Sequence, residues 1–270
     1  VNPSDYEHVL ENINEENEIN FETRSSLSSK EFGHTAQYDT IIHNYLKESK
    51  FSNDFTLTYT KHSDMRYGEN PHQDAAAFKI PGDKSNSILN AKIHQGKKLS
   101  YNNIMDADAA LSCLKEFKST ACVIVKHANP CGVALGTNML DVYKKAFAAD
   151  SISAFGGIIA INQPCDDILA EEISKVFVEI VLAPAFTKKS LDIFSKKKNL
   201  RVLEIGNVEP RDQLLEVRNI VGGIIVQETD TSILSKNSLK TVTDLEPSEE
   251  EINTMLFGWK VLKHIKSNGI

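Results

Sequence analysis

The spacing of apolar residues along the chain changes near residue 50. Over residues 1–50, apolar side chains recur at helical spacing in a context rich in Glu and Lys, which predicts helix. Over residues 51–60, Phe55, Leu57 and Tyr59 alternate with threonines, which predicts a half-buried strand, and a second strand is expected over residues 75–80. The change of period predicts a domain boundary, with one domain over residues 1–50 and a second over residues 51–270.

From residue 100 onward, short apolar runs alternate with amphipathic segments. Residues 121–125 and 157–161 form continuous apolar runs, which are typical of strands buried on both faces of a sheet. Asn102 or Asn103 and Thr137 stand where helix N-caps are expected, and the last helix is expected to start at residues 247–248. Strands alternating with helices predict an α/β fold in which helices cover a sheet. The further expected elements are strands over residues 177–183, 200–205 and 222–227 and helices over residues 166–176 and 190–197.

Composition narrows the class of protein. Apolar residues make up 41% of the 270 residues and charged residues 25%, so the chain can bury a core. The formal net charge of -7 disfavours a nucleic-acid partner but allows a phosphorylated small molecule, which needs few local cations. Four cysteines without a CxxC pair do not predict disulfides. No apolar run approaches the roughly 20 residues of a membrane span, and no signal peptide is recognised, so we expect no membrane partner and a cytoplasmic location.

Residues 126–132, with the sequence KHANPCG, directly follow the predicted strand at residues 121–125. Ligands in open α/β sheets collect at the carboxyl ends of strands, and a histidine moves protons near neutral pH. Lys126 and His127 are therefore candidate catalytic residues; the alternative is that they mark the point where the strand meets solvent. A deaminase-type zinc site is disfavoured because Asn129 replaces the glutamate and Ala134 the second cysteine that it needs. Cys131 is a weak candidate nucleophile, since no second histidine stands near it in sequence.

Residues 66–73, with the sequence RYGENPHQ, join a cation, an aromatic ring and an imidazole in one polar segment. Arginine suits phosphate or carboxylate groups, so this segment is a candidate binding site, with a simple polar loop as the alternative. The glycines at residues 156–157 precede a predicted strand and would let a ligand approach the backbone, although turns use glycine equally often. The basic run at residues 196–198 is by itself typical of a solvated helix end.

Four motifs occur in a recognisable order: RYGENPHQ at residues 66–73, GKKLSYNNIMDADA at 96–109, KHANPCG at 126–132 and SISAFGG at 151–157. Together they make the chain similar to the PurH family of bifunctional purine biosynthesis proteins. That family joins an IMP cyclohydrolase domain to an aminoimidazole carboxamide ribonucleotide (AICAR) transformylase domain. The resemblance covers essentially the whole chain. It implies that residues 1–50 are the helical tail of the cyclohydrolase domain and residues 51–270 the first part of a cytidine-deaminase-like α/β transformylase subdomain, so we expect a piece of a longer protein.

The resemblance also implies roles for individual residues. Lys126 and His127 match the family's catalytic pair, in which His127 takes a proton from the substrate's amine and Lys126 assists it. Asn268 matches an asparagine that orients the reacting groups, which displaces its simpler interpretation as a helix C-terminal stop. The implied substrate-binding residues are Arg66, Tyr67, His72, Phe155, Gly156, Glu179 and Lys198, of which the last two rest on spacing alone.

The reaction that this resemblance implies transfers a formyl group from the co-substrate 10-formyltetrahydrofolate to the 5-amino group of AICAR, giving FAICAR. It requires neither a catalytic metal nor a covalent intermediate. The parent protein would also cyclise FAICAR to IMP, and the implied partners are these small molecules and a second copy of the chain in a homodimer. The alternative is that the 270-residue chain alone is a binding or dimerisation scaffold without activity.

Overall fold

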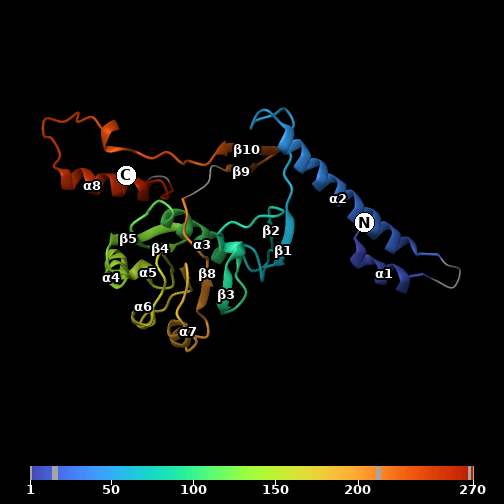
Figure 1. Ribbon diagram of the computed structural model, residues 1–270, viewed down its shortest axis with the longest axis horizontal. Coiled ribbons are helices and arrows are strands. Elements are labelled where there is room, and N and C mark those ends of the chain that lie inside the picture. The colour runs from blue at the N-terminus through green and yellow to red at the C-terminus, as the bar shows by residue number, and fades with distance from the viewer. Residues whose placement is uncertain (1, 14–17, 211–213, 267–268, 270) are drawn as a thin grey trace. The chain divides into compact units, whose positions relative to one another are not determined.

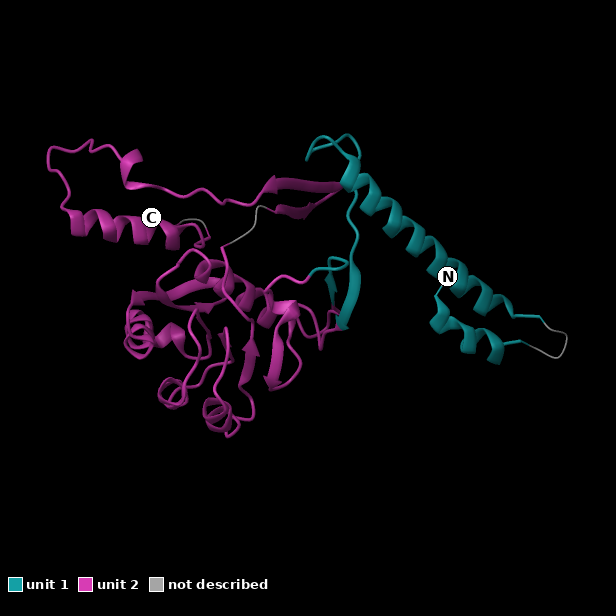
Figure 2. Ribbon diagram, in the orientation of Figure 1, with its two compact units in different colours: residues 1–63, 77–83 teal, residues 64–76, 84–270 magenta. Residues whose placement is uncertain are grey.

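The computed structural model of the chain describes residues 2–13, 18–210, 214–266 and 269. These residues form a mixed α/β protein that divides into two compact units. The first unit comprises residues 1–63 and 77–83, and the second comprises residues 64–76 and 84–270 (Figure 2). The expected α/β class is confirmed by this arrangement of elements.

The first unit begins with helices, as the sequence predicts. A 3-10 helix, η1 (Pro3–Asp5), leads into α1 (Tyr6–Glu11), and α2 (Phe21–Leu46) begins where the Asn20 side chain accepts a hydrogen bond from the backbone N–H of Thr23. The apolar side chains of α2 are largely unburied within this unit: Phe32 is 72% exposed and Tyr45 is 87% exposed. The helical spacing therefore predicts the helix correctly without predicting a buried face.

The strand expected over residues 51–60 is wrong, because the first strand, β1 (Thr60–Asp64), begins where that prediction ends. The backbone carbonyl groups of Asp54 and Thr56 are instead bonded by the side chains of His43 and Asn44 from α2. Side chains of the helix thus take the place of a neighbouring strand along this segment. The expected strand over residues 75–80 is confirmed as β2 (Ala76–Lys79), which pairs with β1.

The second unit is built on a six-stranded mixed sheet with the order β3-β8-β7-β6-β4-β5 (Figure 1). The central strands β6, β7 and β8 are parallel to one another, whereas β4 runs antiparallel to β6 and to β5, and β3 runs antiparallel to β8. The strands are β3 (Lys92–Gln95), β4 (Thr120–Lys126), β5 (Asn129–Gly136), β6 (Ile158–Ile161), β7 (Ile180–Ala183) and β8 (Arg201–Glu204).

Alternate residues of β4, β6 and β7 face two separate apolar cores. In β4, Ala121, Val123 and Val125 pack with α3 (Tyr101–Leu114), whereas Cys122 and Ile124 pack toward the other face. That other face is covered by α4 (Met139–Ala149), α6 (Asp167–Ile173) and α7 (Lys188–Phe194), as Figure 1 shows. The C-terminal helix α8 (Glu249–Leu262) adds Phe257 and Val261 to the core beside α3. Short segments complete the fold: η2 (Ile88–Asn90), α5 (Ser151–Ala154) and η3 (Lys236–Ser238).

Several sequence predictions are corrected at element boundaries. Helix α3 is capped by Ser100 rather than by Asn102 or Asn103, and α4 by Asn138 rather than by Thr137. The last helix begins where it is expected, and Ser248 caps it by forming a capping box with Glu251. The strand expected at residues 222–227 exists as β10 (Gly223–Glu228), but it pairs with β9 (Leu215–Ile220) in a separate exposed hairpin outside the main sheet.

Candidate functional site

Most of the predicted site residues lie where the strands of the main sheet begin or end, along one side of the sheet. Val125 near the end of β4 pairs with Ile158 at the start of β6, which pairs with Ile180 at the start of β7, which pairs with Arg201 at the start of β8. These positions are at the carboxyl end of β4, as expected, but at the amino ends of the three parallel strands β6, β7 and β8. The general preference of ligands for carboxyl ends therefore points to these strand ends only through the antiparallel strand β4.

A cavity of about 230 Å³ opens at these strand ends. It brings together three of the predicted substrate-binding residues, Arg66, Tyr67 and Glu179, from segments far apart in the sequence. Ser100 and Asn103, at the first turn of α3, form another part of its wall. The full lining consists of Arg66, Tyr67, Lys97, Ser100, Asn103, Phe177, Glu179, Asn199 and Arg201.

The charges in this cavity are predominantly positive. Arg66, Lys97 and Arg201 supply three cations against the single carboxylate of Glu179. Nη1 of Arg201 lies 3.6 Å from Oε2 of Glu179, and the Nδ2 group of Asn103 donates a hydrogen bond of 2.7 Å to the same oxygen. The buried Nε of Arg201 has no hydrogen-bond partner among the described residues. An arrangement of this kind suits an anionic ligand that also carries hydrogen-bond donors for the carboxylate.

Aromatic rings border the same cavity. The guanidinium carbon of Arg66 lies 4.6 Å from the ring centroid of Tyr67, and Nη2 of Arg66 donates to the Tyr67 hydroxyl. Phe177, which lines the cavity, packs against Phe155 with their ring centroids 5.4 Å apart. Both phenylalanine rings are about half exposed, so they leave apolar surface available for a planar ligand.

Lys126 is connected to this region through the predicted residues Phe155 and Gly156. Its Nζ donates a hydrogen bond of 2.5 Å to the carbonyl oxygen of Phe155. The backbone N–H of Gly156 donates to the carbonyl oxygen of Phe177 at 2.8 Å. Gly156 has a φ of 71°, and a β-carbon there would lie 3.4 Å from the Phe177 ring and 3.6 Å from Nζ of Lys126. A glycine is favoured at this position by its left-handed backbone and the close approach of both side chains.

His127 occupies a tight turn rather than the loop that the sequence suggests. Lys126 pairs with Asn129 across the ends of β4 and β5, so His127 and Ala128 alone connect the two strands. Both have left-handed backbones, with φ values of 53° and 56°, which is the geometry of a type I′ hairpin turn. Residues 129–136 form an edge strand, β5, where the sequence predicts a break after residue 128. The imidazole of His127 is exposed at the tip of this hairpin and does not line the cavity.

The remaining predicted residues lie elsewhere. His72 is exposed and is not part of the cavity wall. Lys198 lines a separate hollow of about 390 Å³, which shares Phe177 and Asn199 with the cavity. Asn268 lies outside the described residues.

Cys131 has the environment of a structural thiol. Its Sγ donates to the carbonyl oxygen of Ile124 at 3.5 Å. Burial, together with the nearby charge of Asp150, raises the pKa of the Cys131 thiol above its ordinary value. The reactive thiolate is therefore disfavoured at neutral pH, which weakens the interpretation of Cys131 as a nucleophile.

Six residues of the cavity wall are not among the predicted site residues: Lys97, Ser100, Asn103, Phe177, Asn199 and Arg201. The motif at residues 96–109 contains Lys97 and Asn103, so their presence in a recognised motif was a usable signal. Asn103 looks like a helix cap in sequence, and in the structure it both completes the capping box of α3 and binds Glu179. Arg201 gives no signal in sequence because only the pairing of β7 with β8 brings it beside Glu179.

Two features are absent from the part of the chain that the structure describes. No cluster of three or more His, Cys, Asp or Glu side chains in that part is arranged to hold a metal ion. No helix in that part combines the length and the apolar character needed to cross a membrane.

Known proteins resemble the chain along its whole length. The sequence pattern of the family described as "AICARFT/IMPCHase bienzyme" matches residues 1–270. A protein of Leuconostoc citreum named "Bifunctional purine biosynthesis protein PurH" is 47% identical over 270 residues, which cover 100% of this chain and 53% of that protein. A protein of the same name from Acetivibrio thermocellus is 45% identical over 276 residues, which cover 100% of this chain and 54% of that protein. The chain thus spans about half the length of the curated relatives it matches.

Proposed function

The chain belongs to the AICARFT/IMPCHase bienzyme family, and on that premise we propose that it carries the nucleotide-binding part of an AICAR formyltransferase site. The proposed reaction transfers the formyl group of 10-formyltetrahydrofolate to the 5-amino group of AICAR and gives FAICAR. The natural protein that contains the chain would also cyclise FAICAR to IMP, act as a homodimer and work in the cytoplasm. The observation that carries the proposal is the cationic cavity of Arg66, Lys97 and Arg201 beside Lys126 and the Phe155–Gly156 segment.

The cavity offers groups that match a ribonucleotide. Its three cations would hold a phosphate, and the Glu179 carboxylate, held by Asn103, would accept hydrogen bonds from hydroxyl or amide groups. The exposed rings of Phe155 and Phe177 would contact a flat heterocycle. Lys198, in the adjoining hollow, is a further proposed phosphate contact, and His72 and Asn268 remain proposed site residues.

The chemistry requires a base because the amine of AICAR is a poor nucleophile next to an electron-withdrawing carboxamide. His127 would take a proton from the amine as its nitrogen bonds to the formyl carbon. The resulting tetrahedral oxyanion would collapse, and N10 of tetrahydrofolate would leave and receive a proton. The ammonium group of Lys126, the residue next to His127 in the chain, would stabilise the negative charge or favour neutral imidazole. No step of this proposed reaction uses a metal.

The test uses the complete natural protein that contains the chain and follows tetrahydrofolate formation in the presence of AICAR. We expect His127→Ala to lower kcat by about 100-fold or more while nucleotide affinity, measured by calorimetry, stays close to that of the wild type. His62→Ala, which removes an exposed histidine on β1, serves as the matched control. Near-normal turnover in His127→Ala would eliminate His127 as the base, and an inactive wild-type protein would eliminate the reaction itself.

A second hypothesis applies to the 270-residue chain alone. Because the chain spans about half the length of its relatives, the isolated chain is a candidate binding or dimerisation scaffold without activity. Retained AICAR binding with no tetrahydrofolate production in the isolated chain would favour the scaffold, and turnover by the isolated chain would reject it.

A further inference from the structure

The hairpin turn that carries His127 has an unfavourable backbone. His127 and Ala128 both adopt left-handed φ values, although neither is a glycine or an asparagine. The β-carbon of an L-residue crowds the following carbonyl oxygen in this conformation. Such a conformation persists when the surrounding structure holds it in place, and it gathers at functional sites.

Two polar side chains bind the backbone of the turn from different elements. Oδ1 of Asp106, on α3, accepts a hydrogen bond of 2.7 Å from the N–H of Ala128. The Nδ2 group of Asn129, at the start of β5, donates a hydrogen bond of 3.0 Å to the carbonyl oxygen of His127. Both bonds therefore fix the one peptide group that joins His127 to Ala128, Asn129 at its carbonyl oxygen and Asp106 at its N–H.

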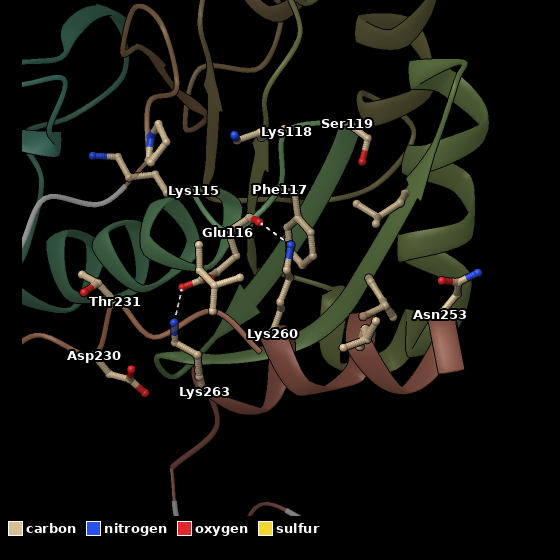
Figure 3. A pocket seen from close by; sticks show the side chains of 15 residues that line it. Lys115, Glu116, Phe117, Lys118, Ser119, Asp230, Thr231, Asn253, Lys260 and Lys263 are labelled. Carbon is tan, nitrogen blue, oxygen red and sulfur yellow. Dashed lines mark hydrogen bonds and ion pairs between the residues drawn. The ribbon is translucent and has the colours of Figure 1, made fainter. Parts of the chain in front are cut away.

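Asn129 also holds a second segment. Its Oδ1 accepts a hydrogen bond of 3.2 Å from the backbone N–H of Lys266, in the chain that follows α8. The end of α8 is anchored close by at Glu116, whose Oε1 lies 3.0 Å from Nζ of Lys263 and 3.3 Å from Nε2 of His264. Figure 3 shows Lys260 and Lys263 reaching Glu116, with Lys260 bonded to the backbone carbonyl of Glu116. One amide thus connects the His127 turn to the segment that precedes Asn268 in sequence.

We propose that Asp106 and Asn129 are positioning residues, which hold the His127–Ala128 turn in its left-handed form and so aim the His127 imidazole. Neither residue needs to touch a substrate for this role. The inference rests on the proposed function, since it gives His127 the part of the base. It goes beyond that function by assigning the orientation of the base to a carboxylate on α3 and to an amide shared with the chain after α8.

Two variants of Asp106 separate the loss of its hydrogen-bond acceptor from the loss of its charge. Asp106→Ala removes the acceptor, whereas Asp106→Asn removes the charge and keeps a carbonyl oxygen that accepts the Ala128 N–H. In the complete natural protein we expect Asp106→Ala to lower kcat by about 10- to 100-fold, with the KM for AICAR within about twofold of the wild-type value. Asp106→Asn should retain kcat within about threefold. Wild-type turnover in Asp106→Ala, or an equal loss in Asp106→Asn, would overturn the positioning role.

Asn129→Ala tests the hydrogen bonds that the Asn129 side chain makes to the His127 carbonyl oxygen and the Lys266 N–H. It should also lower kcat by about 10-fold with KM for AICAR nearly constant, because both the His127 carbonyl and the Lys266 N–H lose their partner. Asn253→Ala, at an exposed site on α8, is the matched control and should leave kcat unchanged. An Asn129→Ala protein with the kcat of this control would contradict the assignment.

A measurement without substrate keeps the inference testable if the wild-type protein transfers no formyl group. Amide hydrogen exchange at Ala128 reports whether its N–H is still bonded. We expect exchange at least about 10-fold faster in Asp106→Ala and close to the wild-type rate in Asp106→Asn. Unchanged exchange in Asp106→Ala would reject Asp106 as the group that holds the turn, whatever the reaction proves to be.

Discussion

The Nδ2 group of Asn103 donates a hydrogen bond of 2.7 Å to Oε2 of Glu179, while the Oδ1 atom of the same side chain accepts the backbone N–H of Ser100. One buried amide therefore fixes both the first turn of α3 and the carboxylate of the cavity. Asn103→Ala removes a capping interaction and leaves Glu179 without this donor. We expect it to lower the free energy of unfolding by about 1–2 kcal/mol and to weaken AICAR binding.

Urea unfolding and calorimetric titration with AICAR would measure these two effects. Asn102→Ala is the neighbouring control, since Asn102 is exposed and its side chain bonds to the carbonyl of Glu69 instead. Equal nucleotide affinity in Asn103→Ala and the wild type would show that Asn103 does not orient Glu179 for the ligand.

Ala128→Gly should stabilise the protein. A left-handed L-residue carries a cost of roughly 1–2 kcal/mol, and glycine removes it at an entropic cost of roughly 0.5–1 kcal/mol in the unfolded chain. The net expectation is a gain of about 0.5–1 kcal/mol in the free energy of unfolding, measured by urea denaturation. The same substitution in the right-handed helix α2, Ala36→Gly, should lower stability instead. A loss of stability in Ala128→Gly would contradict the left-handed turn.

Gly132→Ala should be strongly destabilising. A β-carbon at Gly132 in β5 would lie 2.1 Å from the carbonyl oxygen of Ala146 in α4, so the helix and the strand would have to separate. We expect a loss of about 3 kcal/mol or more, measured by thermal and urea unfolding. Gly258→Ala in α8 meets open space and should instead add up to about 1 kcal/mol. Similar behaviour of the two variants would refute this packing of α4 on β5.

Acid should weaken the attachment of α8 through Glu116. Burial opposes ionisation of this carboxyl, but hydrogen bonds from His264 and Lys263 outweigh it and hold the pKa of Glu116 below its ordinary value. A carboxyl with a lowered pKa in the folded state stabilises the fold above its unfolded pKa, roughly 4.3. That stabilisation is lost as the pH falls through the folded pKa.

Glu116→Gln, which lacks this titration, should therefore lose less stability than the wild type between about pH 7 and about pH 3. Urea unfolding at the two pH values measures the difference. Glu250→Gln, at an exposed site in the first turn of α8, is the control and should follow the wild-type curve. Parallel loss of stability in Glu116→Gln and the wild type would exclude the carboxyl of Glu116 as the acid-sensitive contact.

The fold was predictable where burial alone decides the structure. Residues 121–125 and 157–161 are apolar throughout because both faces of β4 and β6 are covered, and they form strands as expected. β5 was not predictable, because Pro130 and two glycines at residues 132 and 136 look like a loop. Proline is tolerated there since β5 lies at the sheet edge. The alternating residues 51–60 misled the prediction because side chains of α2 satisfy their backbone.

The site was predictable to the extent that its residues stand in dense motifs. Arg66 and Tyr67 belong to such a motif and line the cavity. Phe177 and Arg201 also form part of the wall, but their place there depends on strand register and helix placement that no local pattern encodes. The left-handed turn at His127 was likewise hidden, because neither His nor Ala is a usual residue for it.

The pairing of β3 with β8 has a consequence for how the protein forms during synthesis. Lys92 pairs with Glu204, so β3 emerges from the ribosome well before the strand that completes its hydrogen bonds. β4, β5, β6 and β7 are all translated in the interval. Such distant pairing slows folding and leaves a nascent strand unprotected. Gly96, which follows β3 and packs directly on Arg201, can reach its final environment only after β8 has been made, so the basic wall of the cavity is a late product of translation.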